Sequence, residues 1–455
     1  MMTQAFYTGL SGLKSSSQAI DVISDNLANT ATIGYRGYSA EFSNMFEEAI
    51  NTNTKLSTDN SSIGVGTKVN SIAMNESQGI LQISDRSTDI AILGDGWFGV
   101  QAGSDPVYTR DGSFNFDVNR DLVTQDGYYV LGTMGTNMNN GEIIPEYDAD
   151  GNLANPSVQL GNIDSQEKLR FPSELTYPAL PTTKATFGGN LSFTEDEIAH
   201  DEAALAEIAA NIIDPNDEIA LDRASLSMSS LVIAQDGTKN KLRLGFTKVE
   251  PQVAPGSQWN VIATVESIDG ENIYSTQTGV VSFDEIGAQI SNTLTSIDNQ
   301  GTSVEIDLGT EFSGIIASSG SQFSSSSSAN GLESGDLFGY DINKNGEVVA
   351  TFSNGMQSNV GTIAVYHFPN DRGLERISGA RFVETPNSGE AMFFQDENGN
   401  NILGTDLINF KLESSNVDMT VGLTDLIIMQ RSYDANSKSI TTADEMLKKA
   451  LDMDA

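Results

Sequence analysis

Two apolar patterns with a 3.5-residue period stand near opposite ends of this 455-residue chain, and they constrain its fold more than any other feature. The first comprises Phe6, Leu10, Leu13, Ile20 and Leu27; the second comprises Leu426, Met429, Tyr433, Ile440, Ala443, Leu447 and Ala450, interrupted at Asn436. Such a narrow apolar seam predicts a helix that needs a partner helix. Since terminal segments fray unless they are docked, we expect the two helices to pair with each other or with neighbouring subunits. Packing onto a globular core is the alternative.

The sequence between these helices predicts β-structure. Apolar alternation over residues 88–101 breaks at a Gly-Asp-Gly turn, and residues 107–131 contain two short strands around Asp-Gly turns. We therefore expect a mainly β protein with α-helical termini and nested, discontinuous domains. The expected units are a terminal helical domain of residues 1–31 and 414–455, a connector of 32–75, a β domain of 76–185 and 331–413, and an inserted outer β domain of 186–330.

Three further segments have compositions that favour loops or local helix. The proline-containing residues 171–181 and the Ser/Gly-rich residues 313–329 are typical of linkers. Residues 195–213 predict an acidic helical insert within the outer domain. The two linkers are candidate hinges between the β domains.

Composition excludes several classes of function. Acidic residues outnumber basic ones 62 to 24, giving a net charge of −38, whereas nucleic acids and anionic membranes are recognised through clustered Lys and Arg. No apolar run is long enough to span a membrane, and the first residues lack the pattern of a signal peptide. We expect no nucleic-acid binding, no membrane insertion and, if the protein is exported, a route without a cleaved signal peptide.

Acidic clusters first suggest a metal site. Residues 341–346 resemble the start of a calcium-binding loop, but Phe352 stands where a bidentate Glu is required. Residues 148–152 and 396–400 are similar clusters of turn-forming residues. We interpret all three as turns.

The candidates for catalysis are few. The chain has no cysteine and two histidines. His200 lies in the acidic insert and is expected to be solvated, whereas His367 lies in an apolar run and is expected to be half-buried in a strand. There is no nucleophile elbow and no phosphate-binding loop. The sequence predicts no enzyme, no catalytic or metal residue and no cofactor.

Several motifs occur in order at both ends of the chain. They are GLSGL at 9–13, DVISDNLANT at 21–30, TIGYR at 32–36, YTRDGSF at 108–114, ESSNVD at 413–418 and QRSYDAN at 430–436. Over residues 1–150 and 335–455, the sequence resembles bacterial flagellar rod and hook proteins. The family's motif maps onto Asn26, Asn29, Thr32, Gly34, Tyr35, Asn416, Val417, Asp418, Gln430 and Arg431.

Within this family, the length and the middle block favour a hook-type subunit. The segment GGNL at 188–191 is also similar to hook sequences. The long connector at residues 47–63 instead resembles the distal rod, so a rod-type axial protein of the basal body is the alternative. A secreted acidic adhesin or binding module is an alternative of a different class.

The resemblance implies a flexible tubular joint that transmits motor torque to the filament. It implies export by the flagellar type III apparatus, location in the flagellum outside the cell, and terminal helices that form a coiled-coil pair on assembly. The partners implied are further copies of the chain, rod, hook-cap and hook–filament junction proteins, and the export apparatus. The expected subunit contacts are Leu10, Leu13, Ile20, Leu27, Leu426, Met429, Tyr433, Ile440, Ala443 and Leu447.

Overall fold

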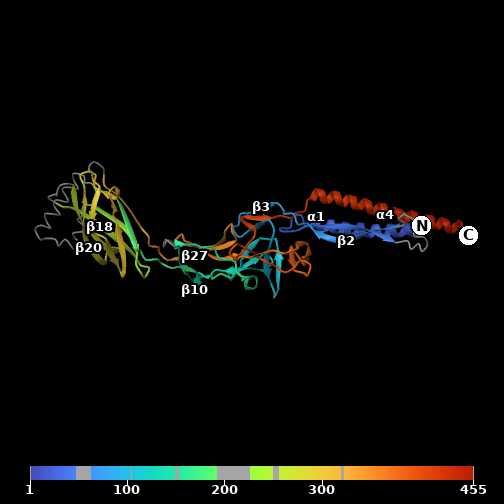
Figure 1. Cartoon of the computed structure of the whole chain (residues 1–455), viewed down its shortest axis with the longest axis horizontal. Coiled ribbons are helices and arrows are strands. Elements are labelled where there is room, and N and C mark those ends of the chain that lie inside the picture. The colour runs from blue at the N-terminus through green and yellow to red at the C-terminus, as the bar shows by residue number, and fades with distance from the viewer. Residues whose placement is uncertain are drawn as a thin grey trace.

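The protein is elongated, with a helical arm at one end and two β regions following it in a row (Figure 1). The structure, a computed structural model, describes residues 2–47, 63–103, 105–148, 153–191, 226–249, 256–318 and 322–453. Both chain ends lie toward the tip of the arm, and β18 (Lys239–Lys248) and β20 (Ile273–Phe283) lie at the opposite end (Figure 1). This arrangement confirms a mainly β fold with helical termini.

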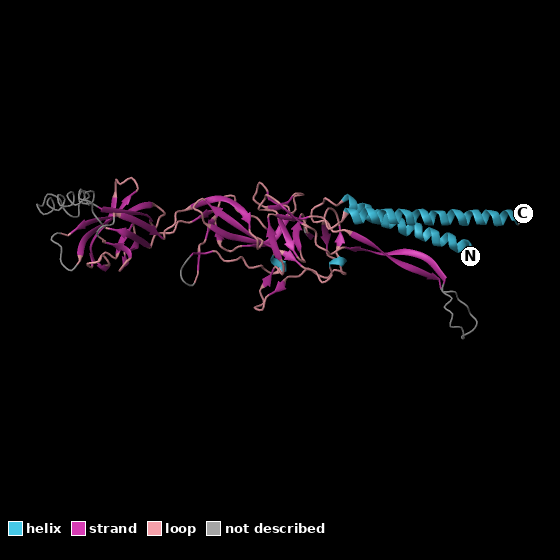
Figure 2. Ribbon diagram, turned by 90° about the horizontal axis from the view of Figure 1, so that it is seen from above, coloured by secondary structure: helices cyan, strands magenta, loops and turns pink. Residues whose placement is uncertain are grey.

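The helical arm contains two long helices and a two-stranded ribbon (Figure 2). Helix α1 (Met2–Ala28) runs beside α4 (Met419–Met453), so the expected pairing of the terminal helices with each other is confirmed. Strands β1 (Tyr38–Glu47) and β2 (Ile63–Met74) pair antiparallel. The ribbon follows α1, where the Ser15 hydroxyl donates to the carbonyl oxygen of Thr67 at 3.0 Å.

The inner β region combines two stretches that are far apart in the sequence. Its largest sheet contains β5 (Trp97–Gln101), β6 (Pro106–Thr109), β9 (Tyr129–Met134), β10 (Met138–Asn139), β11 (Glu142–Ile143), β15 (Thr176–Tyr177), β27 (Gly335–Ile342), β28 (Glu347–Phe352), β29 (Gln357–Ile363), β31 (Glu375–Arg376) and β32 (Arg381–Val383). Four strands branch from it: β7 (Phe114–Phe116), β8 (Leu122–Thr124), β14 (Glu167–Lys168) and β30 (Val365–Tyr366). The antiparallel pairs β9–β29 and β15–β27 join the two stretches.

Smaller ladders complete this region. They are β3 (Leu81–Ile83) with β36 (Lys411–Glu413), β4 (Ile90–Leu93) with β35 (Asp406–Asn409), β12 (Glu146–Tyr147) with β13 (Leu153–Ala154), and β33 (Phe394–Gln395) with β34 (Asn401–Ile402). The core beneath the sheet includes Phe98, Phe114 and Phe171, each at most 1% exposed. Strand β36 leads through residues 414–418 into α4, so the β3–β36 ladder links the arm to this core.

The outer β region has its own core between two sheets. One sheet is the meander β17 (Leu226–Ile233), β18, β19 (Ser257–Ser267), β20 and β21 (Gln289–Asn292); the other contains β16 (Lys184–Asn190), β22 (Ser296–Asn299), β23 (Thr302–Asp307), β24 (Gly309–Thr310), β25 (Ser313–Ile316) and β26 (Ser324–Ala329). Strand side chains point alternately to the two faces, which buries Leu226 and Met228 beside Phe246.

The prediction of a linker over residues 313–329 is wrong. Strand β26 pairs antiparallel with β16, and β25 pairs parallel with it. The two backbones meet closely, since a Cβ added at Gly189 would lie 2.0 Å from the carbonyl oxygen of Ser324. A composition rich in Ser suggested solvation, but its small side chains suit this tight pairing.

The proposed linker at 171–181 is also mainly structured. Phe171 and Tyr177 are buried in the inner core. The chain crosses between the β regions at residues 178–183, which include the end of the predicted linker, and at residues 330–334; Leu180 and Leu332 form an isolated bridge there. These two crossings are the connection between the regions.

Two acidic clusters form turns, as the sequence predicts. The Asn343 side-chain oxygen accepts hydrogen bonds from the backbone amides of Asn345 and Glu347 at 2.9 and 3.0 Å, closing the turn between β27 and β28. Asp396 accepts in the same way from the amides of Asn398 and Asn400 at 2.9 and 2.8 Å.

His367 is 4% exposed, so it is buried rather than half-buried. Its Nε2 lies 2.7 Å from the carbonyl oxygen of Leu403, and burial lowers the pKa of its imidazole. His200, the acidic insert at 195–213, Asp150, Asn152 and connector residues 48–62 lie outside the described residues.

Candidate assembly interface and its polar junction

Small residues on α1 let the two helices of the arm approach closely. A Cβ added at Gly12 would lie 2.5 Å from Nδ2 of Asn436, and one added at Gly9 would lie 2.8 Å from Cγ1 of Ile440. Further along the same face of α1, Ser16 and Ala19 are buried. The interruption of the α4 pattern at Asn436 is therefore part of the helix–helix contact.

The residues predicted for subunit contacts divide into covered and exposed groups. Ala443 is buried, while Leu13, Ile20, Leu27, Leu426, Met429, Ile440 and Leu447 are half-buried. Leu10 is 48% exposed and Tyr433 is 40% exposed. Four further apolar residues, which periodicity did not reveal, are about half exposed on the first turns of α4: Val421, Leu423, Ile427 and Ile428. Val421 and Ile428 lie on one side of the helix, and Leu423 and Ile427 lie on another.

The family-motif residue Asn26 fastens the ribbon to the end of α1. Its side-chain oxygen accepts from the backbone amide of Tyr38 at 2.9 Å, and its Nδ2 donates to the Tyr38 carbonyl at 2.6 Å. Just beyond it, the Thr32 hydroxyl donates to Oδ1 of Asn29 at 3.1 Å. The side chains of the motif thus close the turn that follows the helix.

An ion pair between Asp25 and Arg376, together with Tyr35, connects α1 to the inner β region. The Tyr35 hydroxyl donates to Oδ2 of Asp25 at 3.0 Å, and Nη1 of Arg376 lies 2.8 Å from the same oxygen. The Arg376 guanidinium stacks 5.0 Å from the Tyr35 ring centroid. Burial opposes ionisation of Asp25, but the hydrogen bonds from Arg376 and Tyr35 outweigh it and lower the pKa of this carboxyl.

Gly34 is required by its backbone conformation. Its φ is +66°, in the left-handed region that favours glycine. A Cβ there would lie 2.5 Å from the backbone nitrogen of Asp111. The Gly34 amide donates to the carbonyl oxygen of Glu413 at 2.7 Å, which joins the segments after α1 and before α4.

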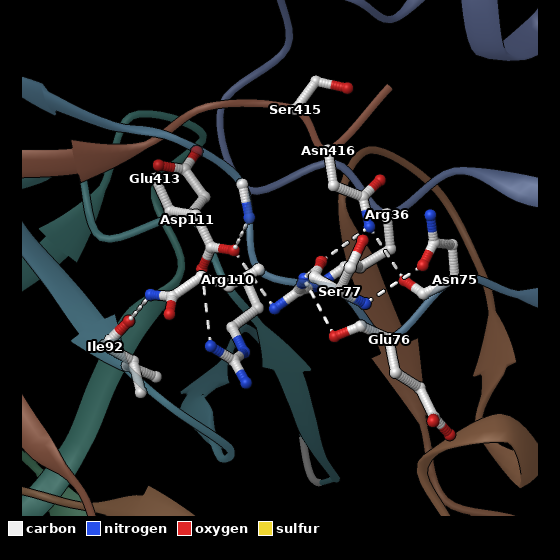
Figure 3. A network of polar contacts seen from close by, with 12 residues as sticks. Arg36, Asn75, Glu76, Ser77, Ile92, Arg110, Asp111, Glu413, Ser415 and Asn416 are labelled. Atoms are coloured by element: carbon white, nitrogen blue, oxygen red, sulfur yellow. Dashed lines mark hydrogen bonds and ion pairs between the residues drawn. The ribbon is translucent and has the colours of Figure 1, made fainter. Parts of the chain in front are cut away.

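Asn416 joins three segments of the junction (Figure 3). Its Oδ1 accepts from the Gly37 amide at 2.8 Å, and its Nδ2 donates to the carbonyl oxygens of Asn75 and Ser77, each at 2.8 Å. One side chain, just before α4, is therefore hydrogen-bonded to both the end of the ribbon and the segment after α1.

At the centre of the junction lies a buried ionic triad of Arg36, Glu413 and Arg110, each 2–3% exposed. Arg36 Nη2 lies 3.1 Å from Oε1 of Glu413, and Arg110 Nη1 lies 3.4 Å from Oε2 (Figure 3). The Gly79 amide donates to Oε1 at 2.8 Å, and Nη1 of Arg36 donates to the Ser77 carbonyl. Burial lowers the pKa of Arg36, and burial together with Arg36 lowers that of Arg110 to about 10.

The remaining motif residues lie on or just before α4. Asp418 caps the helix, accepting from the amides of Thr420 and Val421 at 2.7 and 3.1 Å. Val417 packs near Gly37, where an added Cβ would lie 2.9 Å from its Cγ2. Gln430 and Arg431 are exposed further along α4, away from the junction.

The arrangement is suited to mechanical coupling. Among the described residues no cluster of His, Cys, Asp and Glu is arranged to hold a metal ion. Within the same ranges, neither helix is long and apolar enough to cross a membrane. Charged and polar side chains are used to tie both chain ends to one β region. The fold and the junction thus define an elongated protein with a helical arm that is anchored at its base by buried polar contacts.

Comparison with known proteins finds similarity to flagellar proteins. Three family models match in order: "Flagella basal body rod protein" over residues 6–36, "Flagellar hook protein FlgE/F/G D1 domain" over 91–163, and "Flagellar basal body rod FlgEFG protein C-terminal" over 411–453. Over these three segments the chain is similar to flagellar rod and hook proteins.

The similar curated relatives are named flagellar hook protein FlgE. The protein of Borreliella burgdorferi is 28% identical over 98% of this chain and 99% of its own length. Those of Salmonella typhimurium and Escherichia coli are 26% and 28% identical, each over 99% of this chain and 100% of their own. Among solved structures, Helicobacter pylori FlgE2 matches 73% of this chain and 100% of its own, with 17% identity and a TM-score of 0.45.

Proposed function

We propose that this protein is the structural subunit of a bacterial flagellar hook. The observation that carries the proposal is alignment with curated hook proteins over 98–99% of the chain, which takes in the outer β region as well as the ends. This full-length similarity favours the hook over the distal rod. The family is structural, and the buried polar groups of the junction serve to hold segments together.

Polymerisation would use the exposed surfaces of the arm. The α4 seam is already turned toward α1, so neighbouring subunits would contact the exposed Leu10 and the exposed apolar residues at the start of α4, which are Val421, Leu423, Ile427 and Ile428. Because about half of each side chain is already covered, further burial would contribute roughly 1 kcal/mol per residue. On assembly, the paired helices would form the coiled-coil lining of a tube.

Bending would occur where the two β regions are joined. The crossings at 178–183 and 330–334 are short, and they contact each other through the Leu180–Leu332 bridge and the hydrogen bonds between Asn330 and Thr183. Nearly rigid bodies on such a connection can shift by hinge motion. Rod, hook-cap and hook–filament junction proteins would adjoin the polymer, and the subunit would be exported without a cleaved signal peptide to the outside of the cell.

Immunogold electron microscopy of detergent-extracted flagella tests this function. An antibody against the outer β region should label the curved segment between basal body and filament. Label on the straight shaft below it would favour the rod. Unlabelled flagella with gold elsewhere on the cell would overturn the flagellar role and favour a secreted binding module.

A further inference from the structure

A groove of about 530 Å³ lies at the base of the arm, where α1, β1 and the first turns of α4 meet. Helix α1 contributes Ala19 and Ile23 to its lining, β1 contributes Phe42, and α4 contributes Val421 and Met429. Phe42 is 45% exposed and Val421 is 56% exposed. The groove is therefore an open apolar surface beside the polar junction.

Carboxylates surround this apolar lining. Glu41, Asp418 and Asp425 all line the groove, and its one basic lining residue, Arg372, is paired with Glu76 at 3.2 Å. Asp418 is engaged as the cap of α4. Asp425 is exposed and makes no ion pair with any described residue. This lining would best bind a segment that carries both an apolar side chain and a positively charged one.

The far end of α4 has this chemistry. Met446 is 50% exposed, and Lys449, one turn further on, is also exposed. Lys448 is bound to Asp444 of its own helix at 2.8 Å, whereas Lys449 makes no ion pair with the described residues. Met446 and Lys449 are three residues apart, so they are neighbours on one exposed part of the helix surface.

We propose that the groove receives the last turns of α4 from a second copy of this chain, with Lys449 of that copy facing Asp425. This proposal rests on the proposed function, because it describes a contact within the polymer. On α4 the groove lining includes Asp425, and Lys449 lies 24 residues further along the same helix (449 − 425), about 36 Å at 1.5 Å per residue. Two copies displaced by about that length along the arm bring Lys449 of one copy beside Asp425 of the other. The contact is head-to-tail, so it propagates into a filament.

Charge distribution explains why another copy can approach at this place. Helix α1 carries one lysine against two aspartates, and α4 carries four basic against five acidic residues, a net −2 for both helices. The whole chain carries −38. Repulsion between identical subunits is therefore weakest along the helices.

Engineered cysteines provide a direct test, since the chain has none of its own. The double variant Asp425→Cys/Lys449→Cys is polymerised, oxidised and run on a non-reducing gel. A ladder of cross-linked oligomers is expected. The matched control Asp434→Cys/Lys449→Cys places the first cysteine on an exposed position of α4 outside the groove lining and should give no ladder.

Polymer that forms without a ladder from the groove pair, or an equal ladder from the control, would overturn the docking contact while leaving the hook function intact. Failure of the unmodified chain to polymerise would instead count against the proposed function.

Charge reversal supplies a second measurement. Asp425→Lys and Lys449→Asp should each raise the critical concentration for polymerisation several-fold, and the double variant should recover most of the loss. Asp434→Lys should leave it unchanged. Two single variants that assemble like the unmodified chain, or a double variant worse than both, would contradict the pairing.

Discussion

The helical arm and the inner β region are stabilised in different ways. The β region encloses large aromatic side chains, among them Phe98, Phe114 and Phe171. In the described parts of α1 and α4, the buried apolar residues are Ala19 and Ala443. Alanine removes little apolar surface from water, so the arm gains far less from its own contacts. We therefore expect the β region to be the more stable of the two, and the arm to depend more on the junction and on neighbouring copies.

The largest effect is expected from removing the charge that both arginines share. Glu413→Ala leaves Arg36 and Arg110 buried without their ion-pair partner, which costs about 3–5 kcal/mol in the free energy of unfolding. Urea denaturation followed through Trp97, which lies under Arg110 in the β region, measures it. The control Glu305→Ala removes an exposed partner of Lys184 and should leave the midpoint unchanged. An equally small change for Glu413→Ala would show that the triad is not stabilising.

A substitution in the arm should spare the β region. Gly12→Leu forces a side chain into the contact with Asn436, and overpacking of this kind costs about 1–3 kcal/mol. Helical content by circular dichroism and polymer yield should fall, while the β-region melting temperature stays constant. Ser17→Leu, at an exposed position of the same helix, is the control. A loss of β-region stability with Gly12→Leu would mean that the two regions unfold together.

Ionic strength should act on assembly more than on folding. Each subunit carries −38, and the screening length falls from about 10 Å at 0.1 M salt to about 3 Å at 1 M. Polymer yield measured by sedimentation should therefore rise with salt, even though any single intersubunit ion pair is weakened. A steady fall in yield would show that specific ion pairs, rather than overall repulsion, govern the contact.

The smallest effect concerns acid pH at the end of α1. Because the folded pKa of Asp25 is lowered, its ion pair with Arg376 contributes stability above the unfolded pKa of about 3.9. That contribution is lost as pH falls through the folded pKa. Proteolysis of α1 should accelerate below about pH 4. In the Asp25→Asn variant, the rate of proteolysis should already be higher at neutral pH and should change less on acidification. If the rate of proteolysis depended on pH identically in the unmodified protein and in Asp25→Asn, the ion pair would not contribute to the anchoring of α1.

Periodicity predicted the paired terminal helices and the mainly β middle, because both leave local repeats in the sequence. It did not separate the two faces of α1, since it registers Leu10 and passes over the small residues Gly9 and Gly12 that make the contact. The high serine content of β26 led to a wrong prediction of a linker, because small side chains that allow close pairing were taken as a sign of solvation.

The triad was beyond reach for a different reason. Arg110 and Glu413 are 303 positions apart, and a single sequence does not tell which distant residues meet. Arg36, Arg110 and Glu413 all lie within the sequence motifs, but the motifs do not indicate that the three residues form a triad. A signal was present nonetheless: the chain has only 24 basic residues, and Arg36 is the one charged residue of the TIGYR motif, while Arg110 is the one basic residue of the YTRDGSF motif.

The location of the chain ends has a practical consequence for engineering. Because both termini lie at the tip of the arm and the outer β region lies at the other extreme (Figure 1), a tag fused to either terminus would enter the most crowded part of an assembly. The hairpin between β19 and β20, which turns at Asp269 and Gly270 with open space around that glycine, is a better point of insertion. A peptide placed there would decorate the polymer at the spacing of its subunits.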